Sequence, residues 1–161
     1  MLWPSFERAA GSSRSGGRNV AIIDASLVVA LALRDGRAPA AHALLRTLLA
    51  ASEKLHAPAL LPYEVANGLT RAAVAGDLAP TLVAAAWRGA MALPLHYHPL
   101  AEEAGENVVA IARRLGRQNA YDAAYLALAL DLDTEVWTFD RKLARNAGQL
   151  GYPVKLVEEA A

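Results

Sequence analysis

Four acidic side chains stand where apolar segments of this sequence begin or end. Asp24 closes the run NVAIID, and Asp140 follows the run EVWTF. Glu64 and Asp122 lie at the start of two segments with helical spacing. A carboxylate beside the core loses hydration, so it needs a compensating partner such as a helix end, a proton or a cation. These four residues are therefore the first candidates for chemistry.

Helix capping explains any one of these acids taken singly. Asp24 and Asp140 each precede a predicted helix, although Ser26 is also a plausible N-cap of the first one. Asn119 could cap a later helix with Asp122 three residues on, as a loose capping box. A cap stabilises a protein by about 1 kcal/mol, which is a sufficient reason for a single acid.

Several carboxylates gathered in one place are harder to explain by capping, because they repel one another. A bound cation relieves that repulsion, and oxygen-only ligands suit hard ions such as Mg²⁺ or Mn²⁺. Such an ion can activate a water molecule and polarise a phosphoryl oxygen. Ser26, Asn67 and Thr138 lie two or three residues from an acid, where they could support it.

Composition excludes several classes of protein. The chain has 161 residues, which suits one domain, and its 16 basic and 16 acidic side chains balance. The absence of cysteine removes disulfides, thiol catalysis and thiolate metal sites. That absence fits a cytoplasmic protein, which we expect, and no apolar run is long enough for a membrane span. Residues 1–18 read as a flexible tail rich in glycine, serine and arginine, and residues 19–161 as the folded domain.

Short apolar strands alternate with helices throughout the folded part. The predicted strands are 19–24, 55–60, 93–99, 135–139 and 153–157. The predicted helices are 26–34, 38–54, 61–76, 79–91, 100–116, 119–133 and 141–148. This alternation predicts a three-layer α/β/α fold, with a central parallel sheet of about five strands between two layers of helices.

The predicted sheet places three of the acids on one edge. In a parallel α/β sheet, the carboxyl ends of the strands and the starts of the following helices share one rim, where ligands bind. Asp24, Glu64 and Asp140 are expected on that rim. Asp122 is not placed by this argument, because its helix follows another helix.

Four segments together resemble a known family. AIIDASLVVALAL, PALLPYEVANGLTRA, NAYDAAYLALAL and VWTFDRKLA are similar, in order and spacing, to the four acidic motifs of the PIN-domain ribonucleases. The similarity is greatest to the VapC-type toxins of toxin–antitoxin pairs, and it extends over roughly residues 19–158. It implies that Asp24, Glu64, Asp122 and Asp140 form a metal-binding acidic pocket, with Ser26, Asn67 and Thr138 at its supporting polar positions.

The same resemblance implies an activity and partners. It implies a homodimeric endoribonuclease that hydrolyses RNA with Mg²⁺ or Mn²⁺, through a metal-activated water, and leaves 5′-phosphate and 3′-hydroxyl ends. It also implies a cognate antitoxin that binds and blocks the groove. The N-terminal tail is a departure, since family members usually begin close to the first strand.

Basic residues flank two of the acids and are candidate RNA contacts. Arg117 precedes Asp122, and Arg141 and Lys142 follow Asp140. Cations favour helix C-termini, so the opening position of Arg141 and Lys142 in a helix favours a phosphate-binding role for them.

Other readings remain open from the sequence alone. The chain could be a non-catalytic PIN-like module that binds RNA or protein, or a housekeeping RNA-processing nuclease. A nucleotide-binding fold is disfavoured, because no glycine-rich phosphate loop follows a strand. His96 and His98 share one strand face and suggest a metal pair, although such histidines are more often satisfied at a sheet edge.

Overall fold

Five short parallel strands form the central sheet of the computed structural model, which describes residues 19–159. Their order across the sheet is β3-β2-β1-β4-β5. The strands expected from the sequence are all present, with ends shifted by one or two residues: β1 (Val20–Ile23), β2 (Lys54–Pro58), β3 (Leu95–His98), β4 (Val136–Thr138) and β5 (Val154–Leu156). The predicted tail at 1–18 lies outside the described residues.

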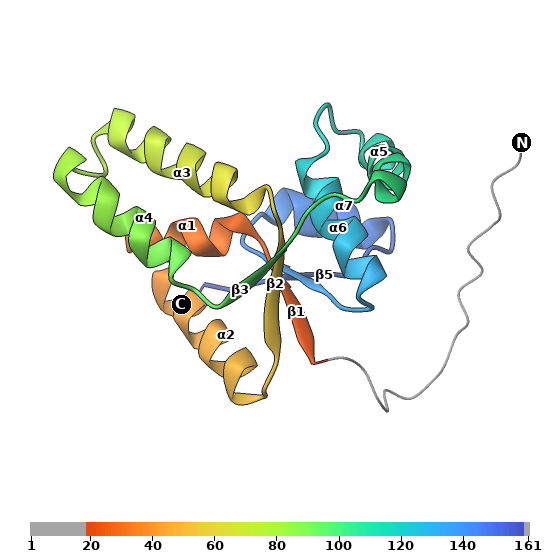
Figure 1. The fold of residues 1–161 in the computed structure, drawn as a ribbon, viewed down its shortest axis with the longest axis horizontal. Coiled ribbons are helices and arrows are strands. Elements are labelled where there is room, and N and C mark those ends of the chain that lie inside the picture. The colour runs from red at the N-terminus through yellow and green to blue at the C-terminus, as the bar shows by residue number, and fades with distance from the viewer. Residues whose placement is uncertain (1–18, 160–161) are drawn as a thin grey trace, which may run out of the picture.

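Helices cover both faces of this sheet, as the three-layer prediction requires (Figure 1). The helices that follow β1 and β2 lie on one side: α1 (Ala25–Leu33), α2 (Ala38–Ala50), α3 (Leu61–Ala75) and α4 (Val83–Met91). Those that follow β3 and β4 lie on the other: α5 (Gly105–Arg114), α6 (Tyr121–Asp131) and α7 (Arg141–Gln149). Short 3₁₀ turns, η1 (Pro80–Leu82) and η2 (Glu102–Ala104), precede α4 and α5. None of the helices in the described part of the chain is long and apolar enough to cross a bilayer.

The strand order reverses beside β1, which creates a natural binding crevice. From β1 the chain moves outward through β2 and β3, then returns to the other side of β1 to form β4 and β5. Right-handed crossovers therefore send α1 and α7 to opposite faces of the sheet. The carboxyl ends of β1 and β4 open between those two helices, at the position where ligands bind in open α/β sheets.

Apolar residues on the central elements hold this arrangement together. The strand β1 contributes Ala21, Ile22 and Ile23 to the core, all essentially inaccessible to water. The helices α1 and α3 approach so closely that a Cβ atom on Gly68 would lie 2.7 Å from the Val29 Cγ2 atom. This close contact fixes α3, and with it Glu64, against the helix that starts at Asp24.

Two expected helix caps are wrong. Asp24, and not Ser26, is the N-cap of α1: its side chain accepts a hydrogen bond from the Ser26 backbone N–H, and Ser26 belongs to the first helical turn. The helix α6 begins at Tyr121 after Ala120, with no side-chain cap, so Asn119 does not form the capping box. Asp122 is paired with an arginine instead.

Candidate active site

Asp24 is the most deeply buried of the four acids and the best held. Only 8% of its surface is exposed. Its Oδ2 atom accepts hydrogen bonds from the Ser26 hydroxyl at 2.5 Å, the Ser26 backbone N–H at 3.1 Å and the Thr138 hydroxyl at 2.9 Å. These bonds all end on Oδ2, so none of them engages Oδ1. The network fixes the carboxylate orientation across the β1–β4 junction.

Asp140 is joined to this network through the backbone at the end of β4. The Asp140 backbone N–H donates to the Thr138 hydroxyl at 2.9 Å, and its Oδ1 atom accepts from the backbone N–H groups of Lys142 and Leu143 at 2.8 and 2.9 Å. The capping role considered for Asp140 is thus confirmed, and α7 holds this carboxylate beside the sheet edge. Its position agrees equally well with a second role, because Oδ2 takes part in neither capping bond.

Glu64 comes from α3 and is fixed by a tyrosine from α6. The buried Tyr125 hydroxyl donates to Glu64 Oε2 at 2.6 Å. This bond joins the first turn of α3 to the second turn of α6, two helices from opposite layers of the fold. Tyr125 had only the profile of a core residue in the sequence. Its position three residues after Asp122, on the same helix face, was the signal that could have indicated contact with the acids.

Asp122 stands beside a cation supplied by the loop before its own helix. Its Oδ2 atom lies 3.2 Å from Arg117 Nε. The buried Nε atom nevertheless has no acceptor with hydrogen-bond geometry, so we regard the contact as an ion pair of poor alignment. Arg117 therefore offsets part of the charge of the acidic cluster.

The charges of the four carboxylates contribute to one another's pKa shifts, so the fold places them within electrostatic range of one another. Burial raises the pKa of Asp24, with a further contribution from the charge of Asp140 and opposition from the Ser26 and Thr138 hydrogen bonds. Burial also raises the pKa of Asp122, Arg117 lowers it, and the charges of Asp24 and Asp140 raise it further. Asp122, which the sheet topology left unplaced, thus joins the other acids.

Glu64 is partly buried, and its pKa is strongly raised. Burial, with the charges of Asp24 and Asp122, raises its pKa to about 7, against the opposing effect of the Tyr125 hydrogen bond. Part of the Glu64 population is therefore protonated at neutral pH. A cluster of acids that holds a proton at neutral pH has too little positive charge nearby to balance its carboxylates.

The chemistry of these side chains fits a hard divalent cation. All four offer carboxylate oxygens, which Mg²⁺ and Mn²⁺ prefer, and their mutual repulsion would be relieved by the ion. Within residues 19–159, no three acidic or histidine side chains are already gathered tightly enough to hold a metal. A cation would therefore have to draw the carboxylates inward by side-chain rotation.

The expected supporting residues have different fates. Ser26 and Thr138 contact Asp24 directly, and their hydroxyl oxygens lie 3.3 Å apart. Ser26 Oγ also accepts the backbone N–H of Phe139 at 3.0 Å, which fastens α1 to the loop before Asp140. Asn67 is exposed on α3, one turn after Glu64, and within residues 19–159 its side chain makes no hydrogen bond to an acid.

The basic candidates lie around the acids, together with one residue that the sequence did not single out. Arg141 and Lys142 are exposed in the first turn of α7, directly after Asp140. The guanidinium of Arg37 lies 5.5 Å from the centre of the Phe139 ring and is paired with Asp35 at 2.6 Å. Arg37 lies outside the four acidic motifs, so nothing in the sequence indicated that it lies beside Phe139.

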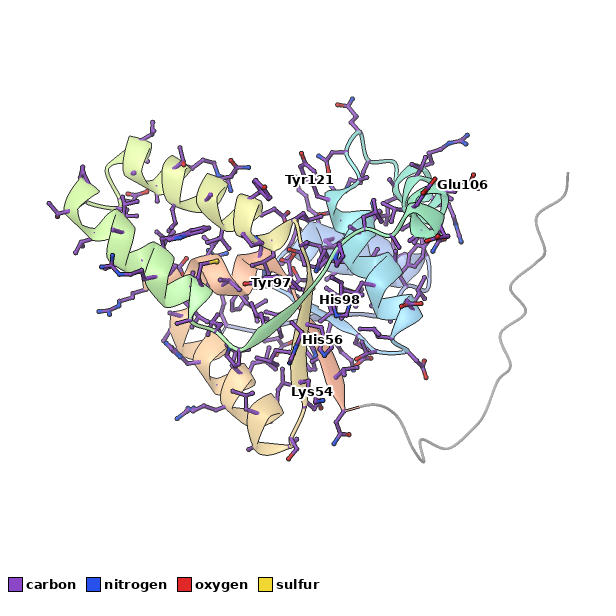
Figure 2. The ribbon with its side chains drawn as sticks, in the orientation of Figure 1. Lys54, His56, Tyr97, His98, Glu106 and Tyr121 are labelled. Carbon is purple, nitrogen blue, oxygen red and sulfur yellow. The ribbon has the colours of Figure 1, made fainter. Side chains whose placement is uncertain are left out.

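The histidine pair takes a form that the sequence did not predict. His56 Nδ1 lies 2.7 Å from His98 Nε2, so the close contact joins two strands rather than His96 and His98 (Figure 2). The ring of His96 is 5.0 Å from that of His56. Burial lowers the pKa of His56, as do His98, His96 and Lys54, so the His56 imidazole is neutral at pH 7. These contacts lie along β2 and β3.

Comparison with known proteins assigns the chain to a family. Residues 21–149 match the PIN domain family. The chain is 32% identical to Ribonuclease VapC3 of Pyrobaculum aerophilum over 136 residues, which cover 82% of this chain and 98% of that protein. It is 34% identical to Ribonuclease VapC9 of Mycobacterium tuberculosis over 140 residues, covering 84% and 97%. The chain therefore belongs to the PIN-domain family, and within that family it is similar to the VapC ribonucleases.

A solved structure has the same fold. The crystal structure of PAE2754 from Pyrobaculum aerophilum aligns with a TM-score of 0.60 over 89% of this chain and 88% of its own, at 23% identity. At this identity the likeness supports the fold alone. The family resemblance inferred from the four acidic motifs is confirmed by the family match and by the relatives.

Proposed function

We propose that this chain is a divalent-metal-dependent endoribonuclease whose active site is formed by Asp24, Glu64, Asp122 and Asp140. The observation that carries the proposal is the electrostatically coupled acid cluster at the carboxyl ends of β1 and β4. Relatives named as ribonucleases, similar over most of the chain, support RNA as the substrate. We assign the activity to a nuclease domain of residues 19–161.

A cation at this site would be held by the four carboxylates. When bound, Mg²⁺ or Mn²⁺ would activate water and neutralise charge on a phosphoryl oxygen. Asp24 is oriented for this task by Ser26 and Thr138, and Asp140 by the N-terminus of α7. Asn67 would act only if it turned toward Glu64, so we give it the weakest supporting role.

Hydrolysis at this site would need only RNA and water as reactants. The oxygen of water bonds to phosphorus, the P–O3′ bond breaks, and a proton reaches the departing O3′ atom. The products are a 5′-phosphate and a 3′-hydroxyl. Glu64, with a pKa of about 7, is a carboxyl group that can hold or release a proton at neutral pH.

The RNA backbone needs positive charge beside these acids. Arg141 and Lys142 are exposed next to Asp140 and can contact phosphate groups. Arg117 lies against Asp122, so it would reach phosphate only when the cation replaces it as the partner of that acid. Binding of the cation to Asp122 would in this way release Arg117 to contact RNA.

The biological role that we propose is that of a toxin controlled by an antitoxin, acting as a homodimer. The similarity to VapC ribonucleases supports this role. We propose that an antitoxin would act by blocking access to the four carboxylates.

A cleavage assay tests the nuclease directly. Purified, antitoxin-free protein is incubated with total cellular RNA in Mg²⁺ or Mn²⁺ and in EDTA, beside the Asp122→Asn variant. We expect metal-dependent cleavage that the variant lacks. Cleavage that persists in Asp122→Asn would contradict this site. Failure of the folded wild-type protein to cut any RNA would favour a PIN-like binding module instead.

A further inference from the structure

Two exposed aromatic rings stand directly beside two of the acids. Tyr63 precedes Glu64 in the first turn of α3 and is 76% exposed, and Tyr121 precedes Asp122 at the start of α6 and is 55% exposed. They are the two most exposed aromatic side chains in residues 19–159. An exposed ring of this size next to a polar site is a candidate contact for a ligand.

The hydrogen bond from Tyr125 to Glu64 brings the N-terminal parts of α3 and α6, which carry these two rings, close together. It joins α6 to α3 at 2.6 Å, and Tyr63 and Tyr121 are the chain neighbours of Glu64 and Asp122. Tyr121 lies one helical turn before Tyr125 and therefore on the same side of α6. Figure 2 shows Tyr121 at the start of α6, on the side toward α3.

Stability of the fold does not account for either ring. Within residues 19–159, neither Tyr63 nor Tyr121 makes a hydrogen bond or a ring contact with another side chain. Neither residue caps its helix. By contrast, Tyr125, from the same helix as Tyr121, is buried and hydrogen-bonded. The exposed pair thus has free ring faces that point out of the protein next to the proposed reaction centre.

We propose that Tyr63 and Tyr121 are positioning residues that stack on unpaired bases of single-stranded RNA beside the phosphodiester held at the acids. This inference rests on the proposed nuclease function and names residues that would position its substrate. Base–aromatic stacking contributes about 1–3 kcal/mol per base and tolerates any base, because every base has a π face. Bases in a duplex are stacked on each other and are not available to these rings, so the stacking role concerns unpaired bases.

RNA binding without cleavage tests the inference. The Asp24→Asn background, in Mg²⁺, is titrated into a fluorescein-labelled random-sequence single-stranded RNA while anisotropy is measured. Tyr63→Ala or Tyr121→Ala in this background should weaken binding by about 5- to 100-fold, and Tyr→Phe at either position should restore it. The control is Val74→Ala, an exposed position at the far end of α3.

An RNA of the same length without bases separates stacking from other contacts. The tyrosine variants should lose no affinity for this RNA, because its backbone is intact but no base can stack. Equal losses on both RNAs would overturn the stacking role.

The two proposals fail differently. Binding of normal RNA that is unchanged in both alanine variants would overturn the inference and leave the nuclease intact, and would point to a protein partner for the rings. Wild-type protein that is folded but neither binds nor cleaves RNA in Mg²⁺ would overturn the nuclease proposal and the stacking role together.

Discussion

The Thr138 hydroxyl serves two acids at once. It donates to Asp24 Oδ2 and accepts the backbone N–H of Asp140, so one side chain on the last residue of β4 links both. It is also completely buried. Its loss would leave a buried N–H without a partner and would loosen the carboxylate that we place at the centre of the site.

Thr138→Val should therefore lower stability and metal affinity together. We expect the free energy of unfolding to fall by about 1–3 kcal/mol. Valine has the shape of threonine but no hydroxyl, so the Asp24 carboxylate and the Asp140 N–H would each lose a hydrogen-bond partner. We also expect about 10-fold weaker Mn²⁺ binding, as is usual when a group that orients a ligand is removed. Urea unfolding and calorimetric titration measure the two effects.

Thr134→Val is the matched control. The Thr134 hydroxyl donates to the Val20 carbonyl oxygen at the other end of β1, away from the acids. This change should lower stability and leave Mn²⁺ binding unaltered. Similar losses of metal affinity in both variants would mean that Thr138 has no special relation to the site.

Glu64 makes the metal-free fold sensitive to pH. Its pKa is raised from 4.5 to about 7 in the folded chain. A raised pKa gives stability that is fully present below pH 4.5 and is lost as pH rises through 7, because the folded state holds a proton that the unfolded state has released.

Glu64→Gln should remove the loss of stability that ionisation of Glu64 causes at high pH, and it should keep the Tyr125 hydrogen bond. Without metal, we expect the variant to be more stable than wild type at pH 8 by about 1–2 kcal/mol, a value reduced for the partial exposure of the side chain. The difference should vanish at pH 4. Denaturant unfolding in EDTA at the two pH values measures it, and a constant difference at both would contradict the assigned pKa.

At the scale of the elements, the packing of α1 against α3 positions two of the acids. Asp24 begins α1 and Glu64 lies in the first turn of α3, and the helices touch at Val29 and Gly68. A β-branched side chain in a helix has little rotational freedom, so Val29 cannot easily move aside. Gly68 is therefore required for this close approach.

Gly68→Ala should destabilise the fold by about 1–3 kcal/mol, because the added methyl would overlap Val29. Gly89→Ala in α4 is the control, since nothing lies within 4 Å of a Cβ atom there. That change should instead stabilise the protein by about 0.5–1 kcal/mol. Thermal unfolding distinguishes the opposite signs, and stabilisation by both changes would contradict the close packing.

Element boundaries were readable because apolar runs and glycines mark them. The helix α3 starts with Pro62 in its first turn and stops at Gly76, which has a φ of 85°, as the sequence indicates. Helix starts without such a marker were harder to place. Ser26 has the side chain of an N-cap but serves Asp24, and that role depends on β4, which is more than a hundred residues away.

At the scale of the molecule, the sequence predicted the class of fold, and it named four acids as candidates without predicting their arrangement. Alternating strands and helices imply a parallel sheet, yet the position of β4 beside β1 is a tertiary choice. Only that choice brings Thr138 to Asp24. Likewise, the Tyr125–Glu64 contact joins two layers that no local pattern relates.

The reversal of strand order places the carboxyl ends of β1 and β4 side by side at the proposed site. Asp24 and Asp140 end the two strands on either side of it, while α3 and α6 bring Glu64 and Asp122 from opposite layers. Four acids from four elements therefore form one region of unbalanced negative charge. The fold tolerates their repulsion through protonation of Glu64, the Arg117 ion pair and, we propose, a bound cation.

Calorimetric titration of Mn²⁺ into the metal-free protein at pH 7 tests this central claim most directly. We expect saturable binding that releases protons, seen as a heat that depends on the buffer, because Glu64 must ionise to bind the ion. Asp24→Asn should weaken binding at least about 10-fold, and Glu64→Gln should abolish most of the proton release. Binding that is equally tight in Asp24→Asn, or absent from the wild-type protein, would contradict a metal site at the four acids.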